Sequence, residues 1–343
     1  MKIICIEEHI ADDNIARATR EAQMAEASYM GDWGSRVNDD LVPFSENRPR
    51  LISLKESMPL ARDMEAGRLA DMDKHGIDMQ ILSHSNPSQL APVAEAKMLV
   101  RAANDRLADA IQANPTRFCG FATLPWQDPQ AAADELERAV TTLGFKGTLL
   151  NGRPGETFLD DERYAPVLAK LNELKVPLYV HPGLPLPQVR LPYYGGLDKE
   201  ISARLSMFGW GWHHEAGIQV IRMMLSGKFD QYPDLRIISG HWGEMVPFYL
   251  QRMDDTIPQE VTGLSRSLTQ TYKQHVYVTP SGMLNLPHFK FIYEVMGADR
   301  ILYAIDYPYL SPMGTREFLE ALPVSQEDKE KIAHRNAEAL FRL

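Results

Sequence analysis

The stretch Ile3-Ile4-Cys5-Ile6-Glu7-Glu8-His9 places an apolar, strand-like run directly before a carboxylate and an imidazole. The same order, an apolar run followed by a polar residue, recurs at His181, at His241 and at Asp306. A parallel barrel brings the carboxyl ends of all its strands to one mouth, where catalytic residues gather. We therefore expect these polar residues, which lie far apart in the chain, to meet at one site.

Apolar strand-like runs alternate with helical patterns along the whole chain, which indicates α/β architecture with a parallel sheet. The expected strands are residues 2–6, 79–83, 119–124, 147–151, 177–181, 236–239, 276–279 and 301–305. Helical patterns cover residues 61–75, 94–112, 129–143, 164–173, 215–228 and 289–296. Eight strands in a chain of 343 residues fit a single (β/α)8 barrel domain over residues 1–343, distorted by insertions.

Local signals support these boundaries. Asp128 before Pro129 is a good helix start, and Gly76 after His75 can take the left-handed position that ends a helix. Two long stretches, residues 10–60 and 182–214, follow the first and fifth strands and are expected to be loops at the carboxyl face. Each is open to two interpretations, a substrate loop or a subunit interface.

The composition excludes several classes of protein. A formal net charge of −10 argues against nucleic acid or an anionic membrane as partner. The chain has two cysteines, Cys5 and Cys119, and no apolar run approaching the roughly 18 residues of a membrane helix. We expect a cytoplasmic protein with a sizeable core, with 44% hydrophobic residues.

Glu7, His9, His181 and Asp306 are the candidate metal ligands. Glu7 and His9 are two positions apart, so their side chains point to the same face of a strand, while Glu8 points to the other. Two imidazoles and two carboxylates suit one Zn²⁺ or Mn²⁺ ion. A single histidine at a strand end is more often structural, and a single Asp before Tyr307-Pro308 is a common turn residue. The prediction depends on all four together.

His241, Glu244 and Arg252 form a candidate second layer. If a helix begins just after the sixth strand, the three lie broadly on one side of it. Glu244 would then orient the imidazole of His241, and Arg252 would hold a substrate carboxylate. An ordinary surface ion pair is an equally good interpretation of Arg252. Asn151, where the fourth strand ends, is a further candidate for substrate binding.

Other histidines carry less information. His75, His84, His275, His288 and His334 fall in helices or loops without obvious partners. The pair His213-His214 follows Trp210-Gly211-Trp212 and is more suggestive, but it can simply open the next helix.

These motifs, in this order, resemble the amidohydrolase superfamily, and within it the branch of γ-resorcylate, 2,3-dihydroxybenzoate and 5-carboxyvanillate decarboxylases. The resemblance covers nearly the whole chain. It is carried by Ile6-Glu7-Glu8-His9, by Arg68-Leu69 with Met72-Asp73 and His75-Gly76-Ile77, by Leu124-Pro125 with Gln127-Asp128-Pro129, by Leu150-Asn151-Gly152, by His181-Pro182, by Gly240-His241 with Gly243-Glu244, and by Asp306-Tyr307-Pro308.

The resemblance implies one bound Mn²⁺ or Zn²⁺, held by Glu7, His9, His181 and Asp306. It also implies an acid–base role for Asp306, supporting roles for His241, Glu244 and Arg252, and a homo-oligomer, either a dimer or a tetramer. Some relatives have a polar or basic residue where this chain has Gly183, which leaves the ring substituents of the substrate open.

The expected activity is metal-dependent, non-oxidative decarboxylation of a small hydroxylated aromatic acid, which makes the chain a carbon–carbon lyase. Asp306 is the expected proton donor to the ring carbon. The enzymatic alternative is a one-metal hydrolase, such as a lactonase, or a hydratase. A two-metal hydrolase would typically carry His-x-His and a lysine at the end of the fourth strand, where this chain has Glu-x-His and Asn151. A barrel that binds metal and ligand without turnover is a third possibility.

Overall fold

The computed structural model describes residues 1–34 and 54–343, and it contains two parallel sheets with the strand orders β1-β2-β3 and β4-β5-β6-β7. The strands are β1 (Ile4–Ile10), β2 (Met79–His84), β3 (Phe118–Gly120), β4 (Thr148–Asn151), β5 (Leu178–His181), β6 (Ile237–Ser239) and β7 (Val276–Val278). Each pairs in parallel with the next within its sheet.

Isolated parallel bridges join the two sheets on both sides. The bridged pairs are Ala122 with Thr148, Val278 with Ile301, and Glu8 with Tyr307. The ring of parallel neighbours is thereby completed, as the predicted (β/α)8 barrel requires. Within residues 301–305, predicted to be the eighth strand, Ile301 forms the bridge to Val278, and single backbone hydrogen bonds reach β7 and β1 without a regular ladder. The barrel is therefore distorted at this position.

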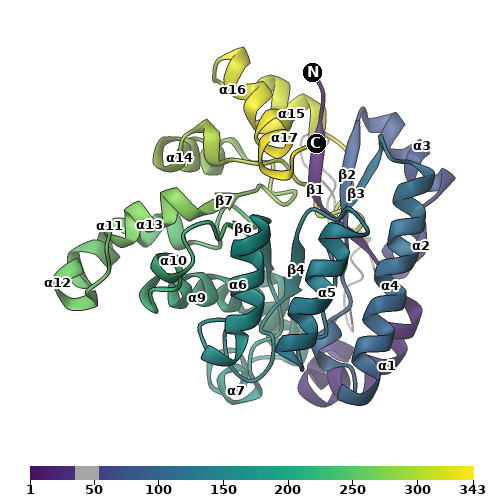
Figure 1. The fold of residues 1–343 in the computed structure, drawn as a ribbon, viewed down its shortest axis with the longest axis horizontal. Helices are drawn as coiled ribbons and strands as arrows, with labels where there is room; N and C mark the ends of the chain where they lie inside the picture. Colours follow the sequence, from purple (N-terminus) through teal and green to yellow (C-terminus); the bar gives the residue numbers. More distant parts are fainter. Residues whose placement is uncertain (35–53) are drawn as a thin grey trace.

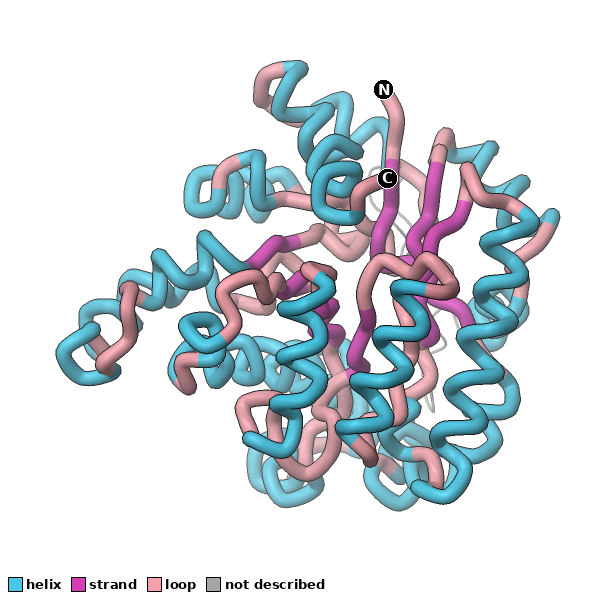
Figure 2. The backbone as a smooth tube through the Cα atoms, in the orientation of Figure 1, coloured by secondary structure: helices cyan, strands magenta, loops and turns pink. Residues whose placement is uncertain are grey.

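Helices surround the barrel as an outer layer (Figure 2). The α-helices are α1 (Asp13–Glu26), α2 (Leu54–Arg62), α3 (Ala66–His75), α4 (Val93–Ala113), α5 (Pro129–Thr141), α6 (Ala165–Leu174), α7 (Pro187–Tyr194), α8 (Lys199–Arg204), α9 (Gly211–Leu225), α10 (Lys228–Gln231), α11 (Val246–Thr256), α12 (Gln259–Thr262), α13 (Leu268–His275), α14 (Leu286–Met296), α15 (Thr315–Ala321), α16 (Gln326–Glu330) and α17 (Asn336–Phe341). Short 3-10 helices are η1 (Ser28–Asp32), η3 (Ser88–Leu90), η4 (Glu162–Tyr164) and η6 (Ala298–Arg300), and π-helices are η5 (Leu205–Gly209) and η7 (Lys331–Arg335).

The predicted helix boundaries are confirmed where capping signals are local. The Asp128 side chain accepts a hydrogen bond from the Ala131 N–H at the start of α5, and Gly76 ends α3 with a φ of 65°. The single helix expected over residues 61–75 is instead two, α2 and α3, separated by a short break.

The two stretches expected to be loops are partly helical. Residues 10–60 contain α1, η1 and α2, with Asp12 as the N-cap of α1; residues 35–53 of this stretch lie outside the described part. Residues 182–214 contain α7, α8, η5 and the start of α9. Figure 1 shows α1 and α7 at the lower end of the molecule, towards which β1 runs. The two stretches pack together there through a small cluster formed by Ala27, Tyr29, Ala203 and Met207.

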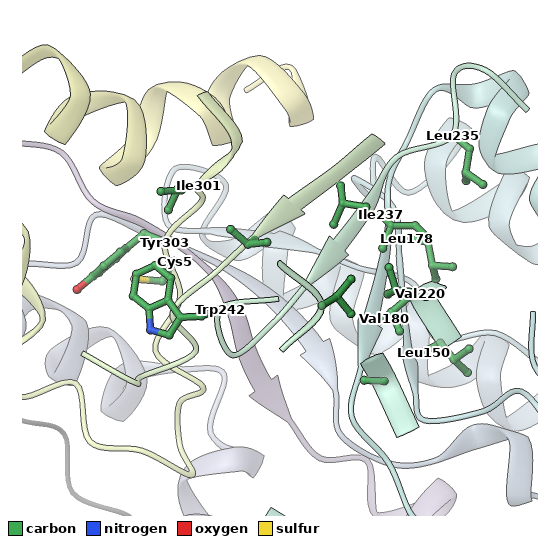
Figure 3. Packing of buried hydrophobic residues seen from close by; sticks show 14 of the residues in the cluster. Cys5, Leu150, Leu178, Val180, Val220, Leu235, Ile237, Trp242, Ile301 and Tyr303 are labelled. Atoms are coloured by element: carbon green, nitrogen blue, oxygen red, sulfur yellow. The ribbon is translucent and has the colours of Figure 1, made fainter. Parts of the chain in front are cut away.

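The core lies in two main layers. A cluster inside the barrel, which includes Ile6, Ile81 and Ile238, also contains Phe341 of α17. A larger cluster packs the strands against the helices; Figure 3 shows Leu178, Val180 and Val220 of α9 among its members. In the described residues no helix is both long enough and apolar enough to cross a membrane.

Candidate metal centre and active site

Glu7, His9, His181 and Asp306 come together at the mouth of the barrel, from β1, β5 and the segment that closes the ring. One ligand atom from each lies within 4.8 Å of the other three. His9 Nε2 lies 3.1 Å from Asp306 Oδ1, and His181 Nε2 lies 3.5 Å from Glu7 Oε1. The structure thus brings together the four residues that were predicted as metal ligands.

The hydrogen-bonding state of these side chains fits a metal ion. Glu7 Oε1, His9 Nε2 and Asp306 Oδ1 are buried and have no hydrogen-bond partner among the described residues. Buried polar atoms are seldom left unpaired. The Nδ1 atom of each histidine has a hydrogen-bond partner. His181 Nδ1 lies 2.8 Å from the backbone oxygen of Pro182, and His9 Nδ1 lies 3.3 Å from the Ser83 hydroxyl. This leaves both Nε2 atoms directed into the cluster, as metal-binding histidines require.

Burial and the neighbouring charged groups shift the pKa values of the cluster residues. Burial raises the pKa of Glu7, although His241 and His9 oppose the change. Burial, together with the neighbouring His9, lowers the pKa of His181 to about 3. For Asp306, burial acts to raise the pKa, but the neighbouring imidazoles of His241 and His9 outweigh it and lower the pKa. Neutral His181 and ionised Asp306 are the states in which these groups bind a metal.

Ser281 is a buried hydroxyl that connects the cluster to His241. It donates a short hydrogen bond to Glu7 Oε2 and accepts one of 2.9 Å from the backbone N–H of His241. Thr279 and Tyr179 extend this hydroxyl network, at 2.8 Å and 3.4 Å from the Ser281 oxygen. Sequence reasoning missed Ser281, because nothing in Pro280-Ser281-Gly282 distinguishes it from an ordinary turn.

Glu8 lies on the opposite side of β1 from Glu7, as predicted from the alternation of a strand. Its Oε1 accepts a hydrogen bond of 3.0 Å from the Ile305 N–H. Next to it, Arg68 donates to Gln80 Oε1 at 3.1 Å and to the backbone oxygen of His9 at 2.7 Å. This buried network supports the backbone that carries two of the candidate ligands.

His241 and Glu244 are in contact, as predicted, but they lie in a turn and not on the predicted helix. His241 Nδ1 lies 2.7 Å from Glu244 Oε1, and His241 Nε2 lies 4.0 Å from Asp306 Oδ2. The segment after β6 is a turn, and α11 begins only at Val246. Helical spacing therefore does not relate His241 to Arg252, because left-handed residues between them change the direction of the chain.

The backbone of the site is strained. His241, Trp242, Glu244, Met245, Ser281 and Asp306 all have φ between 44° and 68°, a region that residues other than glycine seldom occupy. Such strain clusters at functional sites, where the surrounding structure enforces it.

Arg252 is not brought to this site. It is exposed on α11, and no described contact joins its side chain to the metal cluster or to His241. Asn151 does lie at the mouth. Its Nδ2 donates to the His84 oxygen at 3.0 Å, and it lines a cavity of about 270 Å³ together with Gln89, Arg153 and Trp212.

Aromatic rings lie next to the candidate metal centre. The ring of Trp212 lies 6.1 Å from that of His181, and the ring of Tyr309 lies 5.5 Å from that of His9. Arg153, although in the lining, is fully engaged: it pairs with buried Glu215 at 3.0 Å and donates to the Gly155 oxygen at 2.7 Å. Aromatic rings therefore flank both imidazoles of the cluster.

Gly183 has no room for a side chain. A Cβ atom there would lie 2.3 Å from Gly152 Cα, because the ends of β4 and β5 meet at these two glycines. The absence of a polar side chain at this position is thus required by backbone packing.

A parallel α/β barrel with a mononuclear donor set of two histidines and two carboxylates defines the class of metal-dependent barrel enzymes. The amidohydrolase family model matches residues 41–343, and the chain belongs to this family.

Relatives with assigned activities are similar over most of their length. The γ-resorcylate decarboxylase of a Polaromonas species is 34% identical over 99% of this chain and 98% of its own. The γ-resorcylate decarboxylase of Rhodococcus jostii is 36% identical over 82% of this chain and 88% of its own. The structure of 5-carboxyvanillate decarboxylase from Novosphingobium aromaticivorans, with manganese and a hydroxy-methoxy-nitrobenzoic acid bound, has a TM-score of 0.86 at 32% identity, covering 100% of this chain and 96% of that one.

Proposed function

We propose that this protein is a metal-dependent, non-oxidative decarboxylase of hydroxylated aromatic carboxylic acids. The observation that carries the proposal is the set of unpaired, buried ligand atoms on Glu7, His9 and Asp306, which His181 completes. The relatives named γ-resorcylate decarboxylase, and the structures of related decarboxylases with bound manganese, support the same activity.

One divalent ion per chain fits these residues, and manganese is favoured over zinc because related structures hold it. The ion, when bound, supplies a Lewis acid that orients the substrate and stabilises negative charge on its oxygens. Elemental analysis of protein purified without chelator should find close to one equivalent per chain, and the metal should be lost in a His9→Ala/His181→Ala double variant. A stoichiometry near two would contradict the proposed site.

Asp306 is the proposed acid. Because its carboxylate is ionised between two imidazoles, it must take up a proton before it can donate one. The hydroxyl group ortho to the substrate carboxylate can supply that proton, and Asp306 then passes it to the ring carbon that bears the carboxylate. The bond to the carboxylate breaks, CO2 leaves, and its bonding electrons restore the aromatic ring. His241, held by Glu244, faces the second oxygen of Asp306 and stabilises the carboxylate before and after the transfer.

The Asp306→Asn variant tests this assignment. An amide can still coordinate through oxygen but cannot transfer a proton, so turnover should be abolished while metal is retained. In D2O the wild-type product should carry one deuterium on the carbon that lost CO2. An active Asp306→Asn enzyme with its metal bound would refute the acid, and cleavage of esters or lactones without CO2 release would establish the one-metal hydrolase instead.

We also propose that Asn151 contacts the substrate at the mouth, and that the chain is a cytoplasmic homo-oligomer, a dimer or a tetramer. Large exposed side chains on α11 and α14, Phe248, Tyr249 and Phe291, support such an assembly.

Arg252 is also on α11, away from the metal cluster, so a role in substrate binding requires a second copy of the chain. If it has that role, Arg252→Lys should raise KM, because the bidentate guanidinium is lost while the charge remains.

A further inference from the structure

His213, near the start of α9, links Glu244 to η5. Its Nδ1 lies 2.9 Å from Glu244 Oε2, and its Nε2 lies 3.1 Å from the backbone oxygen of Phe208 in η5. Glu244 contacts His241 through its other oxygen, at 2.7 Å. One fully buried carboxylate is therefore shared by two imidazoles, whose ring centroids are 4.4 Å apart.

The contacts determine which ring nitrogens carry hydrogen. A backbone carbonyl and an ionised carboxylate can only accept hydrogen bonds. His213 Nε2 must then donate to Phe208, and the Nδ1 atoms of both histidines must donate to Glu244. Burial acts to raise the pKa of Glu244, but His213 and His241 outweigh it and lower the pKa, which keeps the carboxylate ionised. The Nε2 atom of His241 is left facing Asp306.

We propose that His213 is a positioning residue for the decarboxylation. It holds the second oxygen of Glu244, so that the first oxygen stays on His241 and the His241 ring stays directed at Asp306. Without His213 that second oxygen would be a buried acceptor lacking its donor, and the carboxylate would turn or take up a proton. Partners of this kind in the outer shell of metal sites typically change activity about 10- to 100-fold when removed. The catalytic consequence rests on the proposed function; the positioning itself does not.

The neighbouring residue provides a matched control. His214 is exposed, and its ring stacks on that of Trp210 with centroids 6.4 Å apart. A change at His214 alters the same turn of α9 without touching Glu244. His213→Asn preserves a donor close to the position of Nδ1, whereas His213→Leu keeps the volume and removes the donor.

The experiment compares His213→Leu, His213→Asn and His214→Asn in CO2 release, metal content and melting temperature. We expect His213→Leu to lower kcat about 10- to 100-fold with little change in KM and with one equivalent of metal retained. His213→Asn should restore most of the lost kcat, and His214→Asn should match the wild type. Full activity in His213→Leu, or an equal loss in both His213 variants, would overturn the proposal.

A second measurement is independent of the reaction. In the zinc-loaded protein, which is diamagnetic, the Nδ1–H proton of His241 should give a downfield NMR signal because it is bonded to Glu244. That signal should move or vanish in His213→Leu and persist in His213→Asn and His214→Asn. An unchanged signal in His213→Leu contradicts the positioning role, even if no phenolic acid is decarboxylated. Absence of CO2 release by the wild type, with the signal behaving as expected, contradicts the proposed function alone.

Discussion

The buried imidazole of His84, at the end of β2, should make folding stability depend on pH. Burial lowers its pKa from 6.5 to about 4; Asp12 opposes this change and Arg106 adds to it. The unfolded chain therefore binds a proton below pH 6.5 that the folded chain does not. The stability from neutral His84 is complete above pH 6.5 and is lost as the pH falls towards 4.

Urea unfolding at pH 7.5 and pH 5 measures this effect. His84 should account for a loss of about 2 kcal/mol between the two pH values, from 1.36 kcal/mol per pKa unit. His84→Gln cannot take up the proton, so its stability should fall by that much less over the same interval. Identical losses in the two proteins would assign the pH dependence to other groups.

At the level of secondary structure, the close packing of Gly152 after β4 against Gly183 after β5 fixes the position of His181. Gly183→Ala would push the added Cβ into the Gly152 backbone, and neither side is a flexible side chain that could move away. We expect a lower melting temperature and weaker metal binding, because the end of β5 carries a ligand. Gly31→Ala is the control, since a Cβ there meets nothing within 4 Å. Equal effects of the two substitutions would show that the contact does not matter.

The ends of the strands could be predicted from the sequence because each is marked locally, by an apolar run that stops at a polar residue. Glu7, His9, His181 and Asp306 were found in this way. The turn after β6 could not be predicted, since consecutive left-handed residues such as His241 and Trp242 have no glycine or asparagine signal. The contacts of His213 and Ser281 were also missed, because they join segments 31 and 274 residues apart along the chain.

For the molecule as a whole, metal binding should be coupled to folding. The four candidate ligands come from both ends and the middle of the chain, so an ion bound to them joins segments that the unfolded chain leaves far apart. Metal at about 100 times its dissociation constant stabilises the folded state by about 2.7 kcal/mol. Adding manganese to chelated protein should therefore raise the melting temperature by several degrees. The His9→Ala/His181→Ala variant should show no rise, whereas His334→Ala should behave like the wild type, because His334 in η7 contacts Glu338 and is not a candidate ligand.

The residues with positive φ at the mouth of the barrel also lower the stability of the folded protein, and part of that stability can be restored by substitution. Most residues in that conformation are tied to the chemistry, so replacing them with glycine would relieve strain at the expense of activity. Met245 differs, because its φ is 65° and the residue is 47% exposed. Since the left-handed conformation costs an ordinary residue about 1–2 kcal/mol, and glycine loses about 0.5–1 kcal/mol of that in chain entropy, Met245→Gly should raise the melting temperature slightly with kcat unchanged. Measuring the melting temperature and kcat of that one variant would show whether the backbone strain at Met245 is needed for activity.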